Sequence, residues 1–211
     1  MGCVRVVDQN NPDEETLTLA TEVLTGGGVL VMPTDSVYGI GCVATTNNPG
    51  HERIFEIKHR ERTQTLPWLI ADAKDLDRFA RDVPAWAYRL ADAYWPGALT
   101  LVVRATAQVP LEYVAANGTL ALRVPDSELV CELARRLGPL ATTSANTHGE
   151  AAATSGSGIE SRIIDEADLT LDAGAAPVAI ASTIVDCTVS QPKVLREGAI
   201  PTTDILSSAS A

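Results

Sequence analysis

Residues 28–42 read GVLVMPTDSVYGIGC, and this stretch joins an apolar run to a cluster of small polar side chains. The run VLVM predicts a short buried strand, because it is continuous and apolar. Pro33 and then Thr34, Asp35 and Ser36 follow without a gap. Small hydrogen-bonding residues at a strand end are typical of a turn, and they are equally typical of a ligand site in an open α/β sheet.

The rest of the chain alternates between strand patterns and helical periodicity. Helices are expected at residues 13–25, where three glycines supply the stop, at 51–62, at 127–138, and as one or two helices over 73–95 that are interrupted near Pro84. Strands are expected at residues 66–72, 98–105, 119–125, 139–146, 182–188 and 192–198, the last two as neighbours. This alternation predicts one α/β domain with a mixed, twisted sheet.

The composition limits the classes of function. Of the 211 residues, 45% are hydrophobic and 20% are charged, and the formal net charge is -11. No apolar run approaches the ~20 residues that span a bilayer, and no signal-peptide pattern begins the chain, so a cytoplasmic protein is expected. The acidic balance argues against a broad nucleic-acid surface, but it leaves room for a local basic pocket.

Several well-known functional motifs are missing from the sequence. The four cysteines form no CxxC pair and there are only three histidines, so no metal site is expected. No GxxxxGK[ST] phosphate loop occurs, and GIGCVA lacks the third glycine of a dinucleotide fingerprint. The segment SAN is not a GxSxG elbow, and His148 is too close in sequence to serve Ser144, which disfavours a serine hydrolase.

Five strand patterns end in small polar residues or an arginine, namely VLVMPTDS, TLALRVPD, PLATTSAN, ASTIVD and KVLREG. Any one of them fits a simple turn, whereas five in one domain favour a shared ligand site. Arg123 and Arg196 each follow an apolar run, and a buried guanidinium needs a carboxylate or phosphate, from the protein or from a ligand. Lys58, Arg60 and Arg62 in KHRER fit either a phosphate clamp or a solvated helix end.

A set of segments, in this order, resembles the YrdC-like family: PTDSVYGIGC, KHRERTQTLP, WPGALTLVV, LALRVP, TSAN, STIVD and VLREG. The resemblance covers residues 12–200, and residues 201–211 are expected to be a loosely ordered C-terminal tail. It implies a single YrdC-like α/β domain, with a twisted, mostly open mixed sheet and flanking helices around a concave cavity.

The resemblance implies a nucleotidyltransferase, an L-threonylcarbamoyladenylate synthase. Members join L-threonine, bicarbonate and ATP and release pyrophosphate, with Mg²⁺ carried on the ATP. Partner proteins then transfer the threonylcarbamoyl group to adenosine 37 of tRNA. The isolated chain is therefore expected to bind tRNA weakly or not at all, and no membrane contact is expected.

The resemblance also implies a set of site residues. Threonine is expected to contact Thr34, Arg123, Thr142 and Ser182, with Arg123 at its carboxylate. The nucleotide is expected to contact Lys58, Arg60, Gln64, Thr119, Ser144, Asn146 and Arg196, with Lys58 and Arg60 in the catalytic role at the phosphates.

Two segments depart from the family pattern. Many relatives read KGRP where this chain reads KHRERTQTLP, which makes Arg62 a candidate to share the phosphate contact. Ala152 stands near the place of a serine that contacts the nucleotide in relatives. The glycine-rich segment 147–158 is expected to be a mobile surface loop that can act as a lid.

Other interpretations stay open. A YciO-like, RNA-binding or ribosome-associated module of the same fold would use the cavity for nucleic acid, but the charge of -11 and the lack of basic–aromatic interleaving weigh against it. The carbamoyl-adenylate-forming domain of hydrogenase maturation proteins normally comes with zinc-finger cysteines, which this sequence lacks. The segments WPG and SAN favour the synthase branch.

Overall fold

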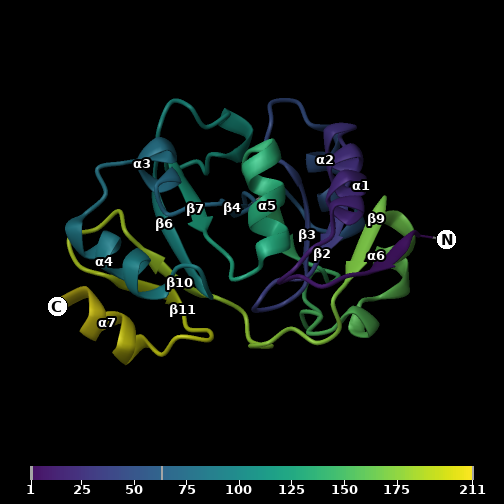
Figure 1. The fold of residues 1–211 in the computed structure, drawn as a ribbon. Helices are drawn as coiled ribbons and strands as arrows, with labels where there is room; N and C mark the ends of the chain where they lie inside the picture. Colours follow the sequence, from purple (N-terminus) through teal and green to yellow (C-terminus); the bar gives the residue numbers. More distant parts are fainter. Residues whose placement is uncertain (1, 63, 211) are drawn as a thin grey trace.

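A long mixed sheet runs through the computed structural model, which describes residues 2–62 and 64–210 (Figure 1). The strands follow the order β1-β9-β2-β3-β8-β4-β7-β6-β10-β11, and β5 pairs with β6 beside this path. They are β1 (Val4–Val6), β2 (Leu30–Met32), β3 (Gly39–Val43), β4 (Trp68–Leu69), β5 (Ala80–Arg81), β6 (Leu99–Ala105), β7 (Thr119–Arg123), β8 (Leu140–Ser144), β9 (Leu169–Asp172), β10 (Thr183–Asp186) and β11 (Lys193–Arg196). The predicted α/β class with a mixed, unclosed sheet is confirmed.

Helices cover both faces of the sheet. They are α1 (Glu14–Thr25), α2 (Pro49–Ile57), α3 (Asp75–Phe79), α4 (Ala85–Tyr94), α5 (Glu128–Leu137), α6 (Ser161–Glu166) and α7 (Thr202–Ser210), with 3-10 turns η1 (Leu111–Tyr113) and η2 (Gly156–Gly158). Helices α1 and α5 share a buried cluster with Leu30 and Met32 of β2. Val31 of the same strand joins the cluster on the other face, with Ile54 and Leu90. Successive residues of β2 therefore point to opposite faces, and both faces are buried. No helix of the described ranges is long and apolar enough to cross a membrane.

The helix predicted at residues 51–62 ends earlier than the sequence suggests. It stops at Ile57, and His59 has a φ of 51°, in the left-handed region that ends a right-handed helix. Lys58 and Arg60 consequently lie in the turn that leaves the helix, which frees their side chains to reach towards β8. The strand predicted over 66–72 is likewise shorter: β4 spans Trp68–Leu69, and Pro67 and Ile70 on either side each add one backbone hydrogen bond to a neighbouring strand.

The sequence pattern did not predict β1, β3 or β9. Strand β3 contains two glycines, which normally weaken a strand. A Cβ atom on Gly41 would lie 2.6 Å from Thr142 Oγ1 of the paired strand β8. The glycine therefore serves close strand packing, which sequence patterning does not distinguish from a turn signal.

The prediction of a loosely ordered tail is wrong for residues 202–210. These residues form α7, which packs against α4 (Figure 1). Ile205 is fully buried and Ala209 is 4% exposed, and the Tyr94 hydroxyl lies 2.8 Å from Ser208 Oγ. The apolar i, i+4 pair of Ile205 and Ala209 was the signal for this helix.

Candidate functional site

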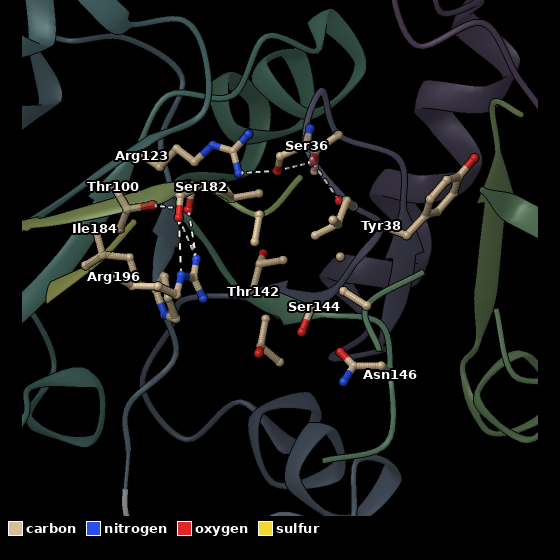
Figure 2. Close-up of a pocket in the computed structure, with 18 of the residues that line it drawn as sticks. Ser36, Tyr38, Thr100, Arg123, Thr142, Ser144, Asn146, Ser182, Ile184 and Arg196 are labelled. Atoms are coloured by element: carbon tan, nitrogen blue, oxygen red, sulfur yellow. Dashed lines mark hydrogen bonds between the residues drawn. The ribbon is translucent and has the colours of Figure 1, made fainter. Parts of the chain in front are cut away.

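A cavity of about 240 Å³ opens where several strands end (Figure 2). Its wall is formed by the turn after β2, the ends of β7 and β8, the residues at the start of β10 and the end of β11. All five segments contribute to it, four through their polar ends and ASTIVD through its first residues, Ala181 and Ser182. Hydroxyl groups, an amide and two arginines therefore face one space, beside a few apolar side chains.

Seven of the eleven predicted site residues line this cavity: Thr34, Arg123, Thr142, Ser144, Asn146, Ser182 and Arg196. All four of the predicted threonine contacts are among them. The other four, Lys58, Arg60, Gln64 and Thr119, are not part of its wall. The structure thus brings together the residues predicted to contact the amino acid and leaves part of the predicted nucleotide set outside the wall.

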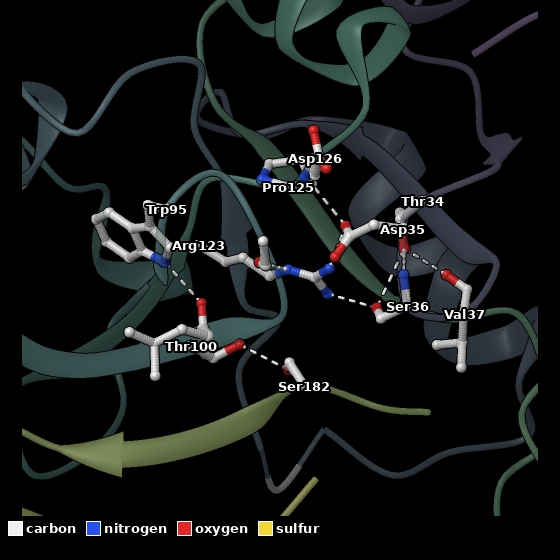
Figure 3. A network of polar contacts seen from close by, with 12 residues as sticks. Thr34, Asp35, Ser36, Val37, Trp95, Thr100, Arg123, Pro125, Asp126 and Ser182 are labelled. Atoms are coloured by element: carbon white, nitrogen blue, oxygen red, sulfur yellow. Dashed lines mark hydrogen bonds and ion pairs between the residues drawn. The ribbon is translucent and has the colours of Figure 1, made fainter. Parts of the chain in front are cut away.

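Arg123 is held at the end of β7 by three protein groups (Figure 3). Its Nη2 donates to Asp35 Oδ1 at 2.5 Å, its Nη1 to Ser36 Oγ at 2.7 Å and its Nε to the Gly97 carbonyl at 2.9 Å. The pair is buried, with side-chain exposures of 8% for Arg123 and 5% for Asp35. Burial lowers the pKa of Arg123, and the Asp35 carboxylate opposes that shift. Two of the five guanidinium N–H groups have no partner within the described residues and are left for a ligand.

Thr34 closes the turn that presents Asp35 and Ser36. Its hydroxyl donates to the Val37 carbonyl at 2.7 Å and accepts from the Ser36 backbone N–H at 3.2 Å. Asp35 Oδ1 also accepts from the Asp126 N–H at 3.1 Å. The small polar residues after β2 therefore build a tight turn that fixes the buried arginine.

Lys58 lies behind the cavity wall and is 2% exposed. Its Nζ donates to the Ser144 carbonyl at 2.5 Å, to the Asn146 carbonyl at 2.6 Å and to Asn146 Oδ1 at 3.4 Å. These oxygens engage all three ammonium hydrogens, so Lys58 ties the end of β8 to the turn after α2. Burial, reinforced by the charge of Arg60, lowers the pKa of Lys58 to about 8.

Arg60 reaches the cavity wall through Thr143. Its Nη1 donates to Thr143 Oγ1 at 3.4 Å and its Nη2 to Gln64 Oε1 at 2.8 Å. Burial lowers the pKa of Arg60. Thr119, in contrast, lies four residues before Arg123 on β7, about 13 Å away along the strand. Its hydroxyl donates to Asn117 Oδ1 at 2.7 Å.

Arg196 faces the cavity from the end of β11 (Figure 2). Its Nη2 and Nε donate to the Ser182 carbonyl at 2.7 Å and 3.3 Å. Burial lowers the pKa of Arg196. Its position beside Ser182 places a guanidinium on the side of the cavity opposite to the Ser144 and Asn146 side chains.

Lys58, Arg60 and Arg196 share one electrostatic feature. Within residues 2–62 and 64–210, none of the three forms an ion pair with a carboxylate, although the chain has 27 acidic residues. Surface arginines such as Arg135 and Arg136 do form such pairs. Partly buried cations without a counter-charge, in an acidic protein, favour an anionic ligand at this site.

Sequence reasoning missed five residues of the wall that carry polar side-chain groups: Ser36, Tyr38, Thr100, Thr143 and Glu150. Ser36 belongs to the polar cluster after β2, so its type was visible but its contact with Arg123 was not. Thr100 lies inside the predicted strand 98–105, where strand alternation places it on one face without indicating a cavity. The part of the chain that the structure describes contains no group of three or more His, Cys, Asp or Glu side chains that could hold a metal ion.

The fold and the cavity together define a class: an α/β domain whose strand ends enclose one cavity that is lined by hydroxyl groups and two arginines. A family model named for Sua5, YciO and YrdC, and described as telomere recombination, matches residues 22–198. The chain belongs to this Sua5/YciO/YrdC family, which confirms the resemblance drawn from its motifs.

Known proteins resemble the chain over nearly its whole length. A Mycobacterium leprae protein that provisionally carries the name threonylcarbamoyl-AMP synthase is 35% identical, over 92% of this chain and 89% of its own. The crystal structure of Pyrococcus abyssi Sua5 complexed with L-threonine is similar with a TM-score of 0.89 and 30% identity, over 97% of this chain and 60% of that one. Escherichia coli YciO is similar with a TM-score of 0.87 and 28% identity, over 98% and 100%.

Replacing Asp35 by asparagine should lower the free energy of unfolding by about 3–5 kcal/mol, because Arg123 is left buried without its counter-charge. The matched control is Glu128→Gln, which removes a partner of Arg135 at the surface, where the side chains are 46% and 51% exposed. That change should cost about 0–1 kcal/mol. Urea unfolding measures both, and equally small changes would contradict a stabilising role for the buried pair.

One lysine should titrate near pH 8. The chain has three lysines, Lys58, Lys74 and Lys193, and burial lowers the pKa of Lys58 to about 8 from an ordinary 10.5. Between these values the unfolded state binds more protons, so the Lys58 contribution makes the free energy of unfolding rise with pH in this window. Lysine-selective NMR tests the pKa, with Lys58→Arg to assign the resonance. Three lysines that all titrate above pH 10 would refute it.

Proposed function

We propose that this chain is a threonylcarbamoyl-AMP synthase, which forms L-threonylcarbamoyladenylate and pyrophosphate from L-threonine, bicarbonate and ATP. The observation that carries the proposal is a single cavity that joins Arg123, with N–H groups left for a carboxylate, to Arg196 and the adjoining Arg60, which lack carboxylate partners. The names of the similar proteins, and the L-threonine in the Pyrococcus abyssi Sua5 structure, support it.

The reaction needs positioning and charge neutralisation more than an acid–base pair. The threonine amine and bicarbonate form a carbamate and release water. A carbamate oxygen then attacks the α-phosphorus of ATP, and pyrophosphate leaves. Arg123 orients the threonine carboxylate through paired N–H groups, and Arg60 and Arg196 offset the phosphate charge. Mg²⁺ is brought on the triphosphate and supplies further charge neutralisation there.

Lys58 contributes by position and charge. Its ammonium group holds the backbone carbonyls of Ser144 and Asn146, and thereby fixes two residues that line the cavity. The adjoining segment 147–158 serves as a lid that keeps water from the labile carbamate. It is anchored at its first residue and near its middle, because the Thr147 N–H donates to Glu160 at 2.7 Å and the Tyr38 N–H donates to the Ala153 carbonyl at 2.9 Å. The adenylate then passes to proteins that modify tRNA.

Pyrophosphate release should require all three substrates. The purified chain is incubated with ATP and bicarbonate, with or without L-threonine, and pyrophosphate and the adenylate are measured together. Threonine-dependent formation of both products is expected. Pyrophosphate release that is indifferent to threonine, or no product from the folded protein, would contradict the proposed function.

Arg60→Ala should weaken ATP binding by about 1.5–3 kcal/mol, the usual value of a hydrogen bond to a charged group. Threonine binding should change little, because Arg60 is not part of the cavity wall. Arg135→Ala is the matched control, since Arg135 is 46% exposed, is already paired with Glu128 and is not part of the cavity wall. Calorimetric titration with ATP compares the two variants. Unchanged affinity in a folded Arg60→Ala protein would exclude Arg60 from the phosphate contacts.

A further inference from the structure

Three hydroxyl groups of the cavity, those of Thr34, Tyr38 and Thr142, already donate to backbone carbonyls. A hydroxyl carries one hydrogen, so it donates one hydrogen bond at a time. The Thr34 hydroxyl donates to the Val37 carbonyl at 2.7 Å, and the Thr142 hydroxyl donates to the Leu140 carbonyl at 3.2 Å. These two predicted threonine contacts can therefore accept a hydrogen bond from a ligand but cannot donate one without breaking a contact of the fold.

The hydroxyls of Thr100 and Ser182 form a different arrangement, a pair joined at 2.8 Å (Figures 2 and 3). Both residues line the cavity, with exposures of 3% and 7%. Whichever hydroxyl donates within the pair, the other keeps its hydrogen for a ligand. The pair thus offers one donor together with acceptor positions, which is the complement of a ligand hydroxyl.

The pair is held in place. Thr100 lies within β6, and the Ser182 carbonyl accepts from Arg196 Nη2 at 2.7 Å. Ile184 is in register with Thr100 on the neighbouring strand, and it lies two residues after Ser182, on the same face. Ile184 also lines the cavity. A hydroxyl pair next to an aliphatic side chain fits a ligand group that carries both a hydroxyl and a methyl.

We propose that Thr100, acting with Ser182, recognises the side-chain hydroxyl of the amino-acid substrate and sets the selectivity for threonine over its aliphatic isostere, valine. The identity of the amino acid rests on the proposed function. Valine would leave this buried hydroxyl pair without a partner, and sites built to bind a hydroxyl reject ligands that lack it. Thr100 is thereby a specificity-determining residue.

The test compares Thr100→Val with a matched control, Thr170→Val. Thr170 is also a buried strand threonine, 1% exposed, but it lies on β9 outside the cavity wall. Calorimetric titration of the full chain with L-threonine and L-valine gives the ratio of their affinities. Thr100→Val should lower this ratio about tenfold. Thr170→Val should leave it unchanged, and Thr100→Ser, which keeps the hydroxyl, should retain most of it.

Ser182→Ala removes the other hydroxyl of the pair. If thermal unfolding shows that Thr100→Val does not fold, the ratio of threonine to valine affinity is measured on Ser182→Ala instead. An unchanged ratio in the folded variant would overturn the inference, and the proposed function would stand if threonine-dependent pyrophosphate release persists. A wild-type protein that binds threonine no better than valine would also overturn the inference. A wild-type protein that binds neither amino acid would overturn both.

Discussion

The buried ion pair between Asp35 and Arg123 is the interaction on which the site depends. It connects the turn after β2 to the end of β7, two segments that are separated by β3, β8 and β4 in the sheet. Because the guanidinium also binds Ser36 and the Gly97 carbonyl, its plane is fixed before any ligand arrives. A fixed fork of this kind reduces the conformational entropy lost on binding a carboxylate.

The cations around the cavity follow a second constraint. Arg123 is neutralised by the protein, whereas Lys58, Arg60 and Arg196 meet only carbonyls, hydroxyls and amides within the described residues. A chain with a net charge of -11 could readily supply carboxylates here. Glu150 is the one carboxylate in the cavity wall among the described residues. Cations without carboxylate partners therefore lie beside a neutral ion pair, which suits a ligand with a carboxylate at one end and phosphates at the other.

The sequence was most informative where strand ends carried unusual residue types. Five such segments predicted one shared site, and all five reach the cavity, four through their ends and ASTIVD through its start, because the topology of an α/β sheet brings strand ends together. The sequence was least informative about contacts between residues that lie far apart along the chain. No local sequence pattern shows that Asp35 pairs with Arg123, or that the Ser144 carbonyl at the end of β8 accepts a hydrogen bond from Lys58. Likewise β3 and α7 depend on packing against β8 and α4, which outweighs local patterning.

The most direct test of this account is a crystal structure of the chain with L-threonine and a non-hydrolysable ATP analogue. The account predicts both ligands in the one cavity, with the threonine carboxylate on Arg123 and the phosphates towards Arg60 and Arg196. The Asp35–Arg123 pair should be unchanged from the unliganded state. Threonine bound away from Arg123, or a nucleotide bound on another face of the molecule, would contradict it.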